Sequence, residues 1–211
     1  SDAELFFGRE KLVDELLSRV KASRTVFITG ASGSGKSSLV RAGLIPALKK
    51  GGIKTSKSNE WIYASMKPGR EPFKALAASL SRIKMEVGDY FEKNVSAPEI
   101  LHKCAEALLS ESANQRFVLF IDQFEEAFTQ ISKEEDRVAF LNLLTNAATV
   151  ENGRVIILFS MRSDFISNCA TYPQLNELLN SQFKQIGAMQ PDELVSAIAQ
   201  PALRVGLRID P

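Results

Sequence analysis

Eight residues near the start of the chain constrain its fold more than any others. Gly30 to Ser37 read G-A-S-G-S-G-K-S and match in full the phosphate-binding pattern G-x-x-x-x-G-K-[S/T]. A β-branched, apolar run over 25–29 precedes the motif, and a helical pattern follows it. Glycines let a backbone wrap closely around phosphate oxygens with its N–H groups turned inward. The order of strand, glycine turn and helix therefore predicts a binding site for a nucleoside triphosphate.

The side chains of this loop predict the role of each position. Lys36 is expected to reach the β- and γ-phosphates as a point charge, and the Ser37 hydroxyl to join the coordination shell of Mg²⁺. The expected cofactor-binding residues of the loop and the first helical turn are Gly30, Ala31, Ser32, Gly33, Ser34, Gly35, Lys36, Ser37 and Ser38.

Length and composition limit the class of protein. A chain of 211 residues can bury one sizeable core with a small appended subdomain, and its net charge of +1 does not direct it to nucleic acid or membranes. Cys104 and Cys169 lack the spacing of metal ligands, so we expect reduced thiols, with a single disulfide as the alternative. Without a membrane span or secretory leader, we expect a cytoplasmic domain, cut from a longer protein because it starts at Ser1 without Met.

Strand and helix patterns alternate along the chain, which predicts an α/β fold with a parallel sheet covered on both faces. The expected strands are 25–29, 61–65, 116–122, 154–161 and 183–187. We predict a three-layer α/β/α sandwich around a mainly parallel five-stranded sheet. The expected divisions are a leading segment over 1–24, the core over 25–190 and the start of a C-terminal helical lid subdomain over 191–211.

Three local patterns refine this outline. Pro46 is expected to kink or loosen the helix after the phosphate loop. Ser132 and Glu135 resemble a capping box that opens a helix reaching Val150. The segment 49–59 is rich in Lys, Ser and Gly, which is typical of a mobile loop.

An acidic group follows the third expected strand, where the chain reads F-V-L-F-I-D-Q-F-E-E. Asp122 ends this strand at the edge where α/β sheets bind ligands, so we predict that it is a partner of Mg²⁺. Glu125 and Glu126 follow within one turn and are candidates to polarise an attacking water. The alternatives are that Asp122 only caps the next helix and that the glutamates lie on a solvated face.

The fourth expected strand ends in a cation. Arg162 follows an apolar run and precedes Ser163 and Asp164. At this position a guanidinium group would lie beside the γ-phosphate and distinguish triphosphate from diphosphate by charge. The alternative is a salt bridge with Asp164.

Taken together, these motifs resemble the STAND class of P-loop NTPases, which are signal-transduction ATPases with numerous domains, related to NACHT, NB-ARC and AAA+ proteins. The likeness is greatest to the bacterial branch that is often fused to WD-type repeats or to other sensor and effector modules. The stretches that carry it are F-F-G-R-E over 6–10, S-G-S-G-K-S-S-L-V-R-A-G-L-I-P-A-L over 32–48, P-G-R-E-P over 68–72, D-Q-F-E-E over 122–126 and M-R-S-D-F over 161–165.

The resemblance implies further roles. It makes the loop a Walker A motif, places Asp122 in a Walker B motif, names ATP as the nucleotide and matches Arg162 to a sensor arginine. It also places the turn formed by Phe7, Gly8 and Arg9 against the adenine. Gln123 stands where many AAA+ enzymes carry their catalytic glutamate, so the acid must come from Glu125 or Glu126 and hydrolysis should be slow.

We therefore predict a weak ATPase that acts as a nucleotide switch. ATP and Mg²⁺ would control its conformation and its self-association, and its partners would be the sensor and effector domains of the same full-length chain, with neither membrane nor nucleic acid expected. One alternative is an ATPase like the replication initiators, which acts with nucleic acid. Another is a scaffold that binds nucleotide without turning it over.

Overall fold

A computed structural model describes residues 5–54, 57–111, 114–181, 183–204 and 206. Its centre is a single five-stranded sheet in the order β2-β3-β4-β1-β5, and every pairing in it is parallel. The strands are β1 (Thr25–Gly30), β2 (Ile62–Met66), β3 (Phe117–Ile121), β4 (Val155–Arg162) and β5 (Phe183–Gln185). The predicted α/β class and the five expected strands are confirmed.

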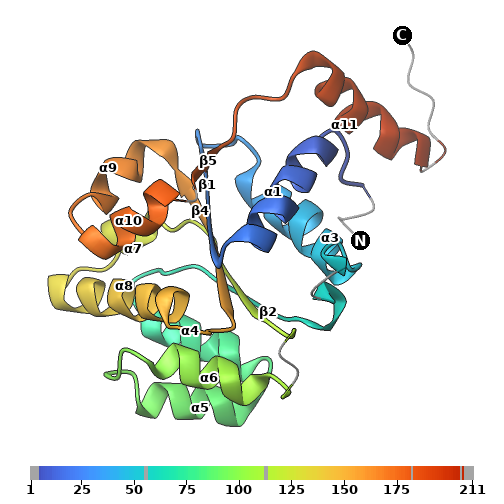
Figure 1. The fold of residues 1–211 in the computed structure, drawn as a ribbon. Helices are drawn as coiled ribbons and strands as arrows, with labels where there is room; N and C mark the ends of the chain where they lie inside the picture. The colour runs from blue at the N-terminus through green and yellow to red at the C-terminus, as the bar shows by residue number, and fades with distance from the viewer. Residues whose placement is uncertain (1–4, 55–56, 112–113, 182, 205, 207–211) are drawn as a thin grey trace.

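Helices cover both faces of the sheet (Figure 1). The helices, short turns included, are α1 (Glu10–Ala22), α2 (Lys36–Ser38), η2 (Leu39–Leu44), α3 (Ile45–Lys49), η4 (Ser58–Glu60), α4 (Pro72–Ser81), α5 (Met85–Lys93), α6 (Ile100–Leu108), α7 (Glu126–Thr129), α8 (Glu134–Thr149), η5 (Ser163–Phe165), α9 (Ile166–Cys169), α10 (Pro173–Ser181) and α11 (Pro191–Arg204).

The sheet divides the core into two layers, because successive side chains of a strand point to opposite faces. Val26 and Ile28 of β1 pack with α1 and with the helix that follows the phosphate loop. Phe27 faces the other way, into the layer of the core that α4, α5, α6, α8 and α10 help to form, and its ring stacks on Phe159 with the ring centroids 4.3 Å apart. The predicted three-layer sandwich is therefore present.

The strand order determines which strand ends meet at the site. β4 lies between β1 and β3, with Gly30 beside Arg162 and Ile121 beside Phe159 in the register. The loop after β1 and the acidic segment after β3 consequently flank the carboxyl end of β4. This order brings residues of β4 between the two motifs that the sequence analysis singled out.

The helix after the phosphate loop is irregular just before Pro46, the residue that was predicted to loosen it. Residues 39–44 form a π-helical turn, and the Ile45 N–H donates to the Val40 carbonyl, five residues back. Pro46 follows at once and has no N–H of its own to donate. The prediction that Pro46 loosens this helix is confirmed.

The predicted capping box at Ser132 and Glu135 is wrong. The residue that precedes α8 is Lys133, and no side chain of the described residues caps this end. Arg137 instead donates through Nη2 to the Ile131 carbonyl at 2.7 Å, and so holds the approach to the helix from within its first turns.

The segment 49–59 was expected to be a mobile loop, but hydrogen bonds of Ser58 tie its second half to Ile53 and to the end of the preceding helix. The buried Ser58 hydroxyl donates to the Leu48 carbonyl at 2.7 Å and accepts from the Ile53 N–H at 3.2 Å. Residues 55 and 56 lie outside the described part.

Cys104 and Cys169 are buried free thiols, as expected, and burial raises their pKa values to about 11 and about 12. Within the described residues no helix has the length and hydropathy to cross a membrane. The helical pattern expected from Pro191 is α11. Residues 205 and 207–211 lie outside the described part of the chain, so the lid subdomain over 191–211 stays a prediction.

Candidate nucleotide-binding site

The loop between β1 and α2 is built on glycines with two different tasks. Gly33 and Gly35 have backbone φ values of +74° and +85°, which residues with a side chain rarely adopt. A Cβ atom added at either position would meet no other atom within 4 Å. These two positions need glycine for their backbone conformation, and the loop there faces open space. A Cβ on Gly30 would lie 2.8 Å from both the Ile186 carbonyl oxygen and the Ser34 hydroxyl, so Gly30 is needed for close packing against the chain after β5.

The Lys36 ammonium group folds back over this loop. Its Nζ donates to the carbonyls of Gly30 at 3.0 Å and Ala31 at 2.7 Å. Burial lowers the pKa of Lys36, and the nearby Glu125 carboxylate opposes that effect. Glu125 and Lys36 line the same cleft, where phosphates are expected.

Asp122 is the centre of a buried hydrogen-bond network. Its Oδ1 accepts from the hydroxyls of Ser37 and Ser160, each at 2.6 Å, and its Oδ2 accepts from Nη2 of Arg41 at 3.2 Å. Burial by itself would raise the pKa of this carboxyl, but the bonds from Ser160, Ser37 and Arg41 outweigh it and hold the pKa below its ordinary value. Asp122 is therefore an ionised carboxylate joined directly to the hydroxyl that was predicted to bind Mg²⁺.

The helix-capping alternative for Asp122 does not hold. Its Oδ1 accepts from the adjacent Gln123 N–H at 3.1 Å, whereas the residue that precedes α7 is Glu125. Gln123 has a φ of +53°, an uncommon conformation for a residue other than glycine, and its N–H also faces the Ser160 hydroxyl at 3.2 Å.

The two glutamates after Asp122 point to different places. Oε2 of Glu125 accepts from the backbone N–H of Arg162 at 3.3 Å, and Glu125 lines the cleft beside the loop. Oε2 of Glu126 accepts from the Gly69 N–H at 3.0 Å, in the P-G-R-E-P turn before α4, and Glu126 does not line that cleft. The geometry therefore separates two residues that the sequence treated as near equals.

Arg162 forms the salt bridge that was offered as the alternative, and its role at the γ-phosphate stays a prediction. Its guanidinium donates to both carboxylate oxygens of Asp164, at 3.1 and 2.6 Å, and lies over the ring of Phe165. Arg162 also lines the cleft, and its side chain is 44% exposed. The salt bridge is real, and the same side chain remains beside the phosphate loop.

The cleft has a volume of about 300 Å³, and half of the predicted site residues line it. Its lining residues are Ser32, Gly33, Gly35, Lys36, Ser37, Ser38, Gln123, Glu125, Ser160 and Arg162. Ser160 and Arg41 were missed by the sequence analysis. A polar residue two places before Arg162 in an apolar strand is the signal for Ser160, and a spacing of one helical turn after Ser37 is the signal for Arg41.

The turn expected to contact adenine lies between α1 and α11 and outside the lining of this cleft. The buried Arg9 side chain donates through Nη2 to the Gly187 carbonyl at 2.9 Å and pairs with Glu193 of α11 at 3.4 Å. Gly8 has a φ of +86°, and the Phe7 ring lies under the guanidinium of Arg204 at 5.5 Å. Contact of these three residues with adenine stays a prediction.

The residues present fit both a triphosphate and Mg²⁺. The open glycines and the Lys36 ammonium form a phosphate cradle, and Ser37 with Asp122 offers hydroxyl and carboxylate oxygens. The described residues contain no group of three or more His, Cys, Asp or Glu able to hold a metal. A magnesium ion here would therefore depend on phosphate oxygens and water for the rest of its shell.

Comparison with protein families identifies the chain. The family model described as Novel STAND NTPase 1 matches residues 1–211. The chain belongs to this family. The resemblance drawn from its motifs is confirmed, and this STAND NTPase domain is a nucleotide-binding NTPase domain. No match was found among curated proteins.

Solved structures share the fold of this STAND domain at low sequence identity. The Walker-type ATPase of Pyrococcus abyssi is 16% identical with a TM-score of 0.62, over 97% of this chain and 60% of that one. The Aeropyrum pernix ORC2 protein in its ADPNP–ADP complexes is 20% identical with a TM-score of 0.61. The match covers 92% of this chain and 50% of the ORC2 chain. AMPPCP-bound DnaA from Aquifex aeolicus is 17% identical with a TM-score of 0.52, and the match covers 95% of this chain and 52% of the DnaA chain. The chain thus spans only part of the length of each.

Proposed function

We propose that this domain is an ATP-dependent switch that binds ATP with Mg²⁺ in the cleft and hydrolyses it slowly. The observation that carries the proposal is the junction of the two motifs, where the Ser37 hydroxyl donates to the ionised Asp122 and where Lys36 and Glu125 line one cleft. This arrangement offers cationic, hydroxyl and carboxylate groups to one bound triphosphate.

Each residue then has a distinct task. Lys36 exchanges its bonds to the loop carbonyls for bonds to phosphate oxygens, and backbone N–H groups of the loop donate to the same phosphates. Ser37 and Asp122 would hold Mg²⁺, which would supply positive charge to neutralise the phosphates. Glu125 orients and polarises the water, and Arg162 leaves Asp164 to reach the γ-phosphate.

Two features favour slow turnover. The amide of Gln123 cannot accept the proton of an attacking water at the position next to Asp122. Glu125 is held by the Arg162 N–H at 3.3 Å, and the Arg162 guanidinium is paired with Asp164. Both partners must rearrange before the γ-phosphate is fully surrounded, so the domain would keep ATP long enough to act as a switch.

A series of contacts connects the loop to α11. Gly30 lies against the carbonyl of Ile186, the next carbonyl accepts from Arg9, and Arg9 pairs with Glu193. We propose that ATP and ADP favour different positions of α11 through this connection. The change would then control self-association and reach the sensor and effector domains of a full-length cytoplasmic protein, without nucleic acid or a membrane.

Turnover and exchange measurements test the proposal. Calorimetry should find ATP affinity that depends on Mg²⁺, with phosphate release well below the ordinary range of about 1–10³ s⁻¹. Hydrogen exchange of α11 should differ between the ADP state and a state with a non-hydrolysable ATP analogue, and light scattering should detect a larger mass only in the latter for the full-length protein. ATP binding without any phosphate release would favour the scaffold alternative. Identical exchange in both states would refute the switch.

A further inference from the structure

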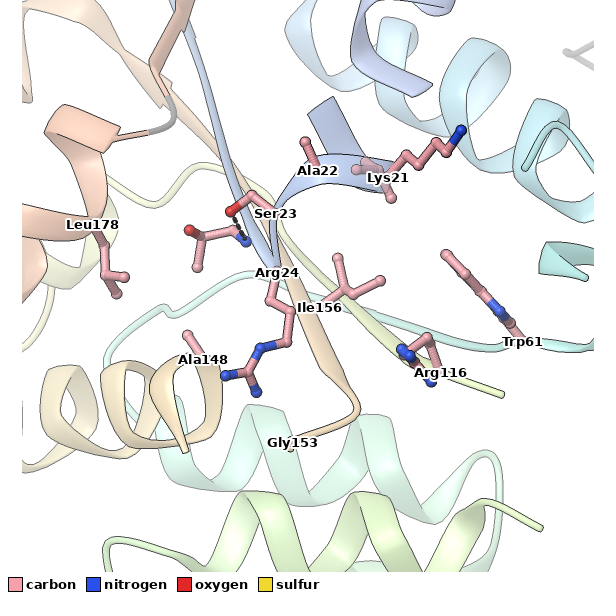
Figure 2. A pocket seen from close by; sticks show the side chains of 12 residues that line it. Lys21, Ala22, Ser23, Arg24, Trp61, Arg116, Ala148, Gly153, Ile156 and Leu178 are labelled. Atoms are coloured by element: carbon pink, nitrogen blue, oxygen red, sulfur yellow. Dashed lines mark hydrogen bonds between the residues drawn. The ribbon is translucent and has the colours of Figure 1, made fainter. Parts of the chain in front are cut away.

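A second polar pocket lies at the other edge of the sheet (Figure 2). It has a volume of about 410 Å³, and residues at or just before the amino ends of strands line it, among them Thr25, Trp61, Arg116 and Gly153. Because all the strands are parallel, their amino ends meet at this edge, away from the phosphate loop. The pocket is thus separate from the nucleotide cleft and shares no lining residue with it.

Arg24 brings a positive charge into this pocket that no described carboxylate pairs with. Its Nη2 donates to the Val150 carbonyl at 2.7 Å, while Nη1 is buried and finds no acceptor among the described residues. A Cβ on Gly153 would lie 2.2 Å from Nη1. The absence of a side chain at position 153 therefore makes room for the guanidinium group.

Arg116 adds a second guanidinium group to the same pocket. Figure 2 shows Arg24 and Arg116 near Ile156, with the ammonium group of Lys21 pointing away from them. Burial lowers the pKa of both arginines, and the charge of Arg116 lowers the pKa of Arg24 further.

The carboxylate that acts on Arg116, Glu106, is already engaged. Arg154 donates through Nε to both oxygens of Glu106, at 3.1 and 3.0 Å. Glu106 offsets part of the charge at Arg116, whereas no carboxylate acts on the pKa of Arg24. The pocket therefore holds more positive than negative charge among its described groups, in a partly desolvated place.

We propose that this pocket binds a small phosphate-bearing anion through Arg24 and Arg116. A planar guanidinium matches two oxygens of a phosphate at once, and a bound dianion would offset the charge of Arg24 and add to the partial offset that Glu106 gives Arg116. The pocket is concave and of small-molecule size, so the ligand is a free phosphate, a pyrophosphate or a phosphate monoester.

Trp61 makes the proposal testable, because it lines this pocket and is the only tryptophan of the chain. Inorganic phosphate, pyrophosphate and ribose 5-phosphate are titrated separately into the Lys36→Ala variant at constant ionic strength. This substitution removes the main cation of the nucleotide cleft, so a saturable change in tryptophan fluorescence reports on the second pocket. Comparing the three probes distinguishes free phosphate from a monoester.

Charge-matched variants provide the control. Arg24→Gln in the same background should weaken binding of the tightest probe by about ten- to a hundredfold, the loss expected for a charge-assisted bond. Arg82→Gln removes one charge from an exposed side chain after α4 and should leave the affinity unchanged. If Arg24→Gln does not fold, Arg116→Gln takes its place. Absence of a saturable fluorescence change, or equal affinity in the pocket variant and in Arg82→Gln, would overturn the proposal.

Discussion

Replacing Ser160 with Ala should destabilise the fold in a manner that depends on pH. The Ser160 hydroxyl is buried and donates to the ionised Asp122 at 2.6 Å. A hydrogen bond to a charged group contributes about 1.5–3 kcal/mol to the free energy of unfolding. For a domain of this size, the loss corresponds to a fall in melting temperature of about 3–12 °C. The Gln123 N–H keeps its bond to Asp122, so no backbone donor loses its last partner.

The pH dependence arises from the lowered pKa of Asp122. Because the folded-state pKa lies below the unfolded value of about 3.9, the carboxylate's interactions stabilise the fold above that pH. This contribution is lost as the pH falls through the folded pKa, where the group becomes protonated. The destabilisation by Ser160→Ala should therefore be full at neutral pH and shrink below about pH 4.

Ser79→Ala is the matched control. Ser79 is also buried, but its hydroxyl donates to the neutral Ser65 carbonyl at 3.2 Å, so its loss should cost about 0.5–1.5 kcal/mol at every pH in this range. Urea unfolding of both variants at pH 7 and pH 3.5, without Mg²⁺ or nucleotide, measures the comparison. Equal losses that do not change with pH would refute the charged hydrogen bond to Asp122.

Three further substitutions test the nucleotide cleft and its connection to α11. Lys36→Ala should lower ATP affinity by at least about tenfold while circular dichroism stays native, since charge-assisted bonds to phosphate are lost; unchanged affinity by calorimetry would argue against the loop assignment. Glu125→Gln should keep ATP affinity and slow phosphate release much more than Glu126→Gln, because only Glu125 lines the cleft; the reverse order would move the water-activating role to Glu126. Gly8→Ala should speed hydrogen exchange in α11, because its Cβ would lie 2.2 Å from the Glu193 carbonyl oxygen. Gly69→Ala is the control, because Gly69 also has a positive φ but a Cβ there would meet no atom within 4 Å. Equal hydrogen exchange of α11 in the two variants would contradict the contact between Gly8 and Glu193.

Much of the site was predictable because its chemistry is local in sequence. The glycine conformations, the lysine and the hydroxyl of the phosphate loop lie within eight successive residues, and each type has a fixed physical role there. Asp122 and Arg162 were predicted for a related reason, since a polar residue that ends a buried apolar strand lies at the ligand-binding edge of an α/β sheet. The predicted capping box failed although its pattern was also local. At α8, Arg137 bonds the backbone before the helix, and the sequence pattern contained no sign of that bond.

Strand order and side-chain partners were decided by tertiary packing alone. The sequence predicted five strands but not that β4 lies between β1 and β3, so it offered no reason to join Ser160 to Asp122 across 38 positions or Arg41 to Asp122 across 81. It favoured Glu125 over Glu126 only slightly, because the difference depends on whether a carboxylate meets the Arg162 or the Gly69 N–H. A local motif fixes which groups a loop offers. Which distant groups reach them depends on how the sheet is ordered and on which faces its helices bury.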